Sequence, residues 1–143
     1  MIRMPAALTA CALTIVLGFG CSEHPTSPAP PAPPSPGSAV VSLATPNSDD
    51  GAVIVTLRGP SGAAISALQV YGTGMQFYTR MASDSEARVI IVGNVSAGPL
   101  FTFKPAAGAA ITAYSGAVTQ VATRGDSLRA SLSGYQVTVT AGP

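Results

Sequence analysis

Tryptophan is absent from this chain of 143 residues, and only one histidine and two cysteines are present. The single His24 lies near the N-terminus, so the rest of the chain cannot build a His-dependent catalytic triad or a histidine metal site. Lys104 is the only lysine and precedes a proline, so a glycine-rich phosphate loop with its lysine is missing as well. We therefore expect no catalytic, cofactor-binding or metal-binding residues, and no enzyme activity.

Charge is equally scarce. Charged residues make up 9% of the chain, and the seven Lys and Arg residues exceed the six Asp and Glu residues by one. A nearly neutral protein lacks the electrostatic field that attracts nucleic acids or anionic lipids. Hydrophobic residues reach 47%, which excludes disorder over the whole length, because disorder requires low hydrophobicity and high net charge. We expect one folded domain that binds no nucleic acid.

Acidic residues are the remaining route to an enzyme or a metal site. Those of the C-terminal part all fall in predicted turns: Asp49, Asp50, Asp84, Glu86 and Asp126. Hydrolysis of glycosidic bonds needs two carboxylates that face each other across the substrate, and the sequence places no two of them so. Residues 47–51 and 84–86 could supply oxygen ligands to Ca²⁺, but Asp, Asn and Ser are also the residues that turns use to bond their own backbone. We favour the turn interpretation for both clusters.

Residues 1–20 combine one positive charge, Arg3, with an apolar run over 6–20. This pattern is typical of a secretory signal peptide, whereas a membrane-spanning helix needs about 20 apolar residues. An uncleaved membrane anchor is the alternative. Loss of the leader would remove Arg3 and leave six basic and six acidic residues.

The sequence Gly-Phe-Gly-Cys at 18–21 places Cys21 directly after the apolar run, behind a small residue. This segment resembles the lipobox of bacterial lipoproteins, in which the leader is cut just before a cysteine that becomes the acylated N-terminus. The resemblance implies a palmitate-bearing membrane anchor on Cys21 and, because Cys11 lies in the leader, no free thiol or disulfide in the mature chain. In bacterial lipoproteins an Asp directly after the acylated cysteine favours retention at the inner membrane, so the same resemblance, with Ser22 at that position, implies the outer membrane of the bacterial cell envelope. The alternative is that Cys21 is an ordinary thiol beyond a conventional cleavage site.

Composition changes abruptly in residues 21–37, where seven of the thirteen prolines occur. A segment of Pro, Ser, Thr and Ala cannot form a packed core, so we expect a disordered tether of polyproline II character that rises about 3.1 Å per residue. The sixteen residues 22–37 would hold a domain up to about 50 Å from the membrane. A proline-rich ligand for a partner domain is the alternative.

Over residues 38–143 the apolar residues alternate with a period of two, which predicts β-strands. We expect strands over 38–44, 52–58, 65–71, 75–80, 86–93, 100–104, 113–123 and 135–140. Seven or eight short strands with turn signals about every 8–12 residues are typical of a small antiparallel β-sandwich. One short helix is expected within 126–134, capped by Asp126 and ended by Gly134. The predicted fold class is therefore all-β.

The strand at 86–93 contains the densest apolar run, Val-Ile-Ile-Val, which predicts a strand covered on both faces. With 100–104 it is expected to form a hairpin. Period two then places Val89 and Ile91 in the core, facing the two phenylalanines of the second strand, and directs Arg88 to water.

The stretch 87–94 followed by 98–103 resembles the central hairpin of cohesin-like β-sandwiches. This resemblance implies a carbohydrate- or protein-binding domain, with a dockerin as one conceivable partner. Neighbouring Phe77 and Tyr78 must point to opposite faces of their strand. One of them could therefore be exposed to contact a ligand, with Tyr71 nearby.

These features together predict a bacterial envelope lipoprotein whose β-sandwich is a non-catalytic interaction or structural module. Its expected partners are the membrane, through the N-terminal lipid, and a protein or glycan ligand that the sequence does not identify. The rivals are a cohesin-like carbohydrate- or protein-binding domain and a small hydrolase built on acidic residues. Two carboxylates facing each other on a concave surface would favour the hydrolase, whereas an exposed apolar patch would favour protein binding.

Overall fold

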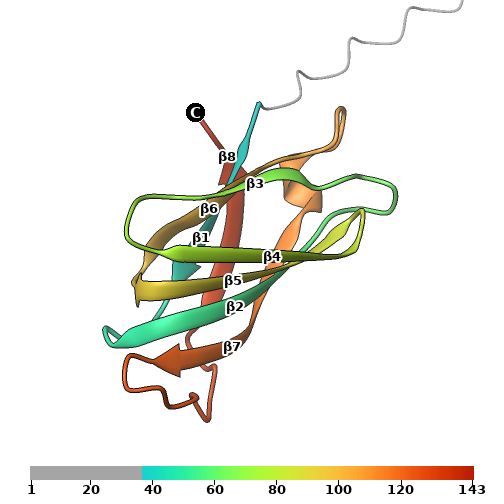
Figure 1. Cartoon of the computed structure of the whole chain (residues 1–143). Helices are drawn as coiled ribbons and strands as arrows, with labels where there is room; N and C mark the ends of the chain where they lie inside the picture. Colours follow the sequence, from blue (N-terminus) through green and yellow to red (C-terminus); the bar gives the residue numbers. More distant parts are fainter. Residues whose placement is uncertain (1–36) are drawn as a thin grey trace, which may run out of the picture. The chain divides into compact units, whose positions relative to one another are not determined.

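Alternating apolar residues produce eight β-strands in the part of the chain that the computed structural model describes, residues 37–143. The elements are β1 (Ala39–Ala44), β2 (Asp50–Arg58), β3 (Ser66–Val70), β4 (Gln76–Ser83), β5 (Glu86–Val95), β6 (Gly98–Lys104), the 3-10 turn η1 (Ile111–Ala113), β7 (Ser115–Thr123) and β8 (Gln136–Ala141). The predicted all-β sandwich is confirmed (Figure 1). The predicted leader 1–20 and residues 21–36, Cys21 included, lie outside the described residues.

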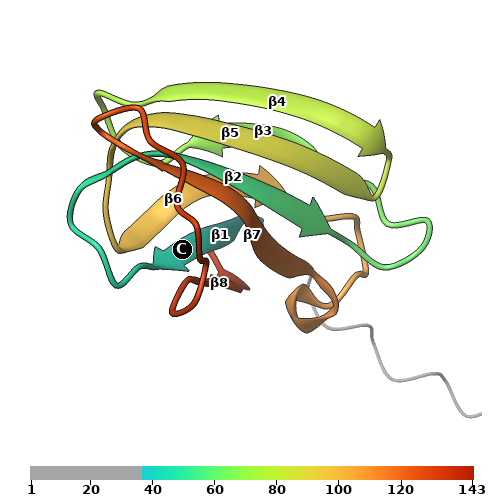
Figure 2. The same ribbon diagram turned by 90° about the horizontal axis from the view of Figure 1, so that it is seen from below.

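The strands form two antiparallel four-stranded sheets. Sheet A has the order β3-β6-β1-β8, and sheet B has the order β4-β5-β2-β7. Figure 2 shows them as two layers packed face to face. Among the strands of residues 37–143, only β4 and β5 are consecutive and hydrogen-bonded to each other; every other connection passes from one sheet to the other.

The predicted hairpin of residues 86–93 and 100–104 is therefore wrong. β5 belongs to sheet B, whereas β6 pairs with β1 and β3 in sheet A. Both strands carry an apolar row, and two such rows bury each other by stacking across the core as well as by lying side by side. Alternation along a strand identifies its buried face but not its hydrogen-bonded neighbour.

The core lies between the two inner faces. Its fully buried members include Val89 and Ile91 of β5 and Phe101 of β6, while Arg88 is exposed. The predicted facing of β5 is thus confirmed. Two aromatic contacts tie the layers and loops together: the Phe77 and Phe101 ring centroids are 5.8 Å apart, and those of Phe103 and Tyr114 are 5.1 Å apart.

The helix predicted within residues 126–134 is not formed, and the short helical turn of the described chain is η1 instead. Asp126 has a φ of +59°, whereas a residue that caps a helix N-terminus has extended backbone. The loop backbone also pairs with the end of β7: Leu128 forms an isolated bridge with Ala122, and the Arg129 amide donates to the Val121 carbonyl at 2.9 Å. Leu128 itself is exposed.

Candidate functional site

The first acidic cluster closes one end of the sandwich. The Asp50 side chain is completely buried and accepts hydrogen bonds from Thr45 Oγ1 at 2.6 Å and from the Tyr135 hydroxyl at 2.9 Å. Arg129 donates to the same carboxylate from Nε at 3.2 Å and from Nη2 at 3.0 Å, and it also pairs with Asp49. The cluster therefore joins the β1–β2 loop to the long loop between β7 and β8.

Opposing effects act on the pKa of Asp50. Burial raises this pKa, but the hydrogen bonds from Thr45, Tyr135 and Arg129 together lower it below its ordinary value. The hydrogen bonds that Arg129 donates to Asp49 and to Asp50, of which the bond to Asp49 has the larger effect, raise the pKa of Arg129. The buried pair is therefore ionised at neutral pH, and the cation beside both carboxylates is the protein's own guanidinium.

The second acidic cluster lies at the turn between β4 and β5. Glu86 accepts a hydrogen bond from Arg58 Nε at 3.0 Å across the β5–β2 ladder. Within residues 37–143 there is no group of three or more His, Cys, Asp or Glu side chains that could hold a metal ion. Asp49, Asp50 and Glu86 thus take part in ion pairs that connect strands and loops.

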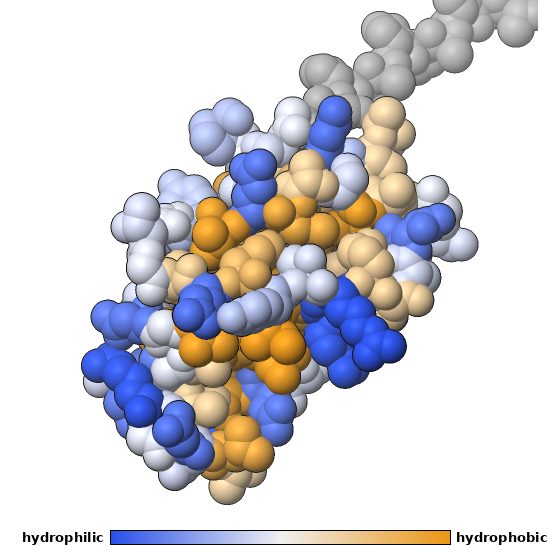
Figure 3. All heavy atoms as spheres, viewed as in Figure 1, coloured by the Kyte–Doolittle hydropathy of each residue, from blue (hydrophilic) through white to orange (hydrophobic). Residues whose placement is uncertain are grey.

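The outer face of sheet B exposes apolar side chains and arginines that form no ion pair within residues 37–143. One row of side chains crosses β4, β5 and β2 on this face and consists of the directly paired Tyr78, Ile90 and Ile54. The next row contains Val92, paired with Ala52. Tyr78 is 55% exposed and Val92 is 38% exposed. Figure 3 shows apolar side chains gathered over this face, with strongly hydrophilic ones beside them. The predicted two-sided covering of β5 is therefore wrong, because its second face is open to solvent.

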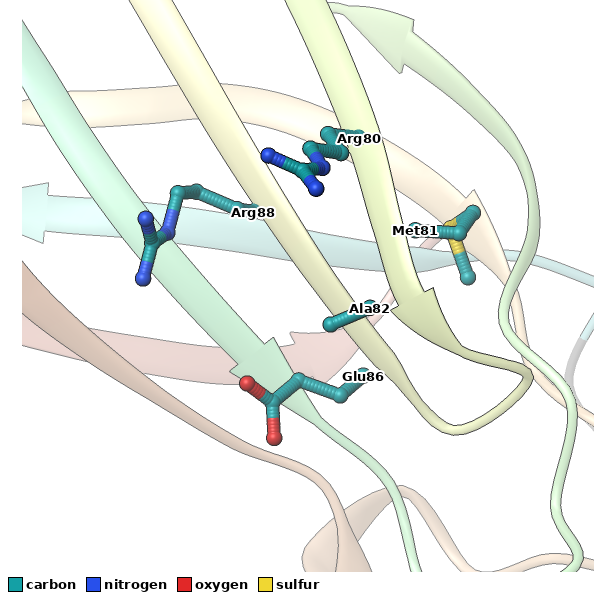
Figure 4. A pocket seen from close by; sticks show the side chains of 5 residues that line it. All are labelled: Arg80, Met81, Ala82, Glu86 and Arg88. Atoms are coloured by element: carbon teal, nitrogen blue, oxygen red, sulfur yellow. The ribbon is translucent and has the colours of Figure 1, made fainter.

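Two arginines stand beside the apolar row. Arg80 of β4 and Arg88 of β5 are directly paired across the ladder, both are exposed, and neither takes part in an ion pair within residues 37–143. They line a hollow of about 350 Å³ with Glu86, Met81 and Ala82, in which the two guanidinium groups project to the same side of the strands (Figure 4). A second hollow of about 300 Å³ joins both arginines to Tyr78 and Ile90.

The outer face of sheet A differs in chemistry. Val40 there is flanked by Thr102 and Thr140, and Ser42 is paired with Thr138. This face presents mainly hydroxyl groups, as is usual for a sheet face in contact with water. Lys104 is exposed on sheet A, but Val40 beside these hydroxyl groups is only 9% exposed, whereas sheet B exposes Tyr78 and Val92 together with its arginines.

The prediction that Phe77 and Tyr78 point to opposite faces is confirmed, whereas the contact of the exposed ring with a ligand stays a prediction. Phe77 packs towards Phe101 in the core while its neighbour Tyr78 is exposed, and Tyr71 is 48% exposed in the β3–β4 loop. Sequence reasoning missed the pair of Arg80 and Arg88. A signal was available, since the two residues are equally far from Asp84 at the turn, and the strands of a hairpin pair such positions.

No protein-family model, curated protein or solved structure matches this chain. Within residues 37–143 there is no helix with the length and apolar character needed to cross a membrane.

Proposed function

We propose that the chain is a bacterial envelope lipoprotein whose β-sandwich is a non-catalytic binding module, which docks a protein partner on the outer face of sheet B. In this proposal the leader 1–20 is removed, Cys21 is acylated and holds the protein at the outer membrane, and residues 21–37 form the tether. The lipobox-like segment 18–21 and the cluster of prolines support the anchor and the tether.

The contrast between the two outer faces carries the docking proposal. A sheet face that contacts only water normally carries polar side chains, as the outer face of sheet A does. Sheet B instead exposes Tyr78 and Val92, half-exposes Ile54 and Ile90, and adds unpaired arginine. Tyr and Arg are enriched where protein interfaces concentrate their binding energy.

The state of the carboxylates supports a non-catalytic role. Glycosidic hydrolysis needs one carboxyl group that holds a proton and one that is free. Arg129 pairs with Asp49 and Asp50, and Arg58 pairs with Glu86. The other two carboxylates, Asp84 and Asp126, are exposed in two different turns. The cohesin-like alternative stays a prediction, and it has lost the hairpin on which the resemblance was based, because β5 and β6 lie in different sheets.

Photo-cross-linking in the cell envelope tests the proposal. A photoreactive phenylalanine analogue replaces Tyr78 in the full chain, and in a matched control it replaces Thr138 on the outer face of sheet A. We expect a discrete cross-linked species from position 78 that is lost when Ile90→Asp is added, and none from position 138. Equal adducts from both faces, or no adduct from position 78, would contradict the docking surface.

A further inference from the structure

The arrangement of Arg80 and Arg88 is unfavourable in the isolated protein. Like charges directly opposite each other on neighbouring strands destabilise a sheet. The nearest acid, Glu86, is bonded to Arg58 on β2. In Figure 4 its carboxylate lies apart from the two guanidinium groups. The next residue of the row, Thr56, is uncharged.

The charge of the folded part is also unevenly distributed. The outer face of sheet B holds three arginines and one glutamate, a net charge of +2: Arg58, Arg80, Arg88 and Glu86. The other charged side chains of residues 37–143 sum to −1: Lys104, Arg124, Arg129, Asp49, Asp50, Asp84 and Asp126. Positive charge is therefore concentrated on the face that also exposes apolar side chains.

We propose that Arg80 and Arg88 bind a carboxylate of an acidic side chain on the docked protein, while Tyr78 and Ile90 contact the apolar residues around it. This inference rests on the proposed docking function of the same face. A planar guanidinium matches the geometry of a carboxylate and can donate two parallel hydrogen bonds to it. The hollow shared by both arginines and Tyr78 places the charged and apolar contacts side by side.

Other occupants fit this surface less well. A second copy of the chain packed face to face would bring the arginines of one protomer towards those of the other, which is electrostatically unfavourable. A membrane surface typically selects clusters of about 4–8 basic residues, and this face offers two unpaired ones. Glycan binding at the face would use an aromatic platform, and Tyr78 is the only exposed aromatic residue in the paired rows of this face.

The arginine pair creates a measurable conflict between stability and binding. Arg80→Glu converts the like-charged pair into an opposite-charged pair across the same ladder position, which stabilises a sheet. The same change removes half of the anion site and repels a carboxylate. We therefore expect the variant to melt at the same temperature as the wild type or higher, and to bind an acidic peptide more weakly.

The test uses the full chain in detergent and a fluorescent peptide of five Glu-Ala repeats, with five Gln-Ala repeats as the neutral probe. Fluorescence anisotropy should show binding of the acidic peptide alone, weakened about tenfold or more by Arg80→Glu. Lys104→Glu, the same charge change at an exposed position of sheet A, should leave the affinity within about twofold. Polygalacturonate and phosphatidylglycerol vesicles serve as the glycan and lipid probes.

Four results would overturn the inference: no binding of the acidic peptide, an affinity unchanged by Arg80→Glu, an equal loss with Lys104→Glu, or tighter Arg80-dependent binding of polygalacturonate or vesicles. The cross-link from position 78 reports separately on the docking face. If the cross-link forms while the peptide test fails, the carboxylate site is wrong and the docking surface stands. If no cross-link forms, the proposed function itself is wrong.

Discussion

Arg129 lies 79 residues after Asp50 in the chain, yet its guanidinium donates to the buried carboxylate from both Nε and Nη2. The contact holds the irregular loop between β7 and β8 against the first residue of β2. Asp50 is fully buried, whereas the Arg129 side chain keeps 22% of its surface exposed. The pair thus connects the core to the solvent side of the loop.

Removing the Asp50 carboxylate should strongly destabilise the fold. Asp50→Ala removes the acceptor of the Tyr135 hydroxyl and the nearer of the two acceptors of the Thr45 hydroxyl, and it breaks a buried ion pair, a loss typically of about 3–5 kcal/mol. Urea unfolding measures the difference. Asp84→Ala, at an exposed turn residue, is the matched control and should change stability by less than about 0.5 kcal/mol. Equal effects of the two substitutions would show that the buried cluster does not stabilise the domain.

Stability should also fall in acid because of Asp50. Its pKa in the folded protein is below the ordinary value of 3.8, so the unfolded chain takes up the proton more readily. The stabilisation is complete above that ordinary value and is lost as the pH falls below it, through the folded-state pKa. Melting temperatures recorded from neutral pH into strong acid should therefore decline more steeply for the wild type than for Asp50→Asn. Parallel curves would argue against the lowered pKa.

Calcium should have little effect on the folded domain. Arg129 occupies the carboxylates of Asp49 and Asp50, and Arg58 occupies that of Glu86. Millimolar Ca²⁺ should shift the melting temperature by no more than about one degree, whereas a ligand at a hundred times its Kd adds about 2.7 kcal/mol, or several degrees in a domain of this size. Mg²⁺ serves as the control cation, and a large shift specific to Ca²⁺ would identify one of these loops as a metal site.

Acylation is predicted to depend on Cys21. In the proposed function, a lipoprotein signal peptidase and its acyl transferase recognise the apolar run 6–20 together with the cysteine that directly follows it. Cys21→Ala should abolish incorporation of labelled palmitate in cells, and Cys11→Ala should retain it. Label that persists in Cys21→Ala would refute the anchor and, with it, the proposed localisation.

The sequence predicted the number of strands and the core-facing side chains of β5, because both depend on local alternation. Period two alone directs Val89 and Ile91 inwards and Arg88 outwards, whatever lies beside them. Which strand pairs with which depends on contacts between residues far apart in the sequence, however. β5 and β6 bury their apolar residues by packing in opposite sheets across the core. The hairpin prediction failed for this reason.

Less of the candidate site than of the fold could be predicted from the sequence. The exposure of Tyr78 follows from its place next to the inward-facing Phe77. The Arg80–Arg88 pair follows from the β4–β5 hairpin, once the turn is placed correctly. The Asp50–Arg129 contact joins two irregular loops, and no periodic pattern connects residues that far apart.

The last prediction separates the two faces of β5. Ile91 is fully buried in the core, whereas Arg88 is exposed opposite Arg80 on the outer face of sheet B, the proposed docking face. Ile91→Asp removes about 1.5–3 kcal/mol of apolar burial and buries an unpaired charge, which together approach the total stability of about 5–15 kcal/mol of a small domain. The variant should fail to fold, as seen by loss of its cooperative melting transition.

Arg88→Ala should change stability by less than about 1 kcal/mol, with an increase expected because a like-charged neighbour of Arg80 is removed. A variant Ile91→Asp that melts like the wild type, beside an Arg88→Ala that unfolds, would mean that β5 presents the opposite face to the core, and the docking surface would then be buried.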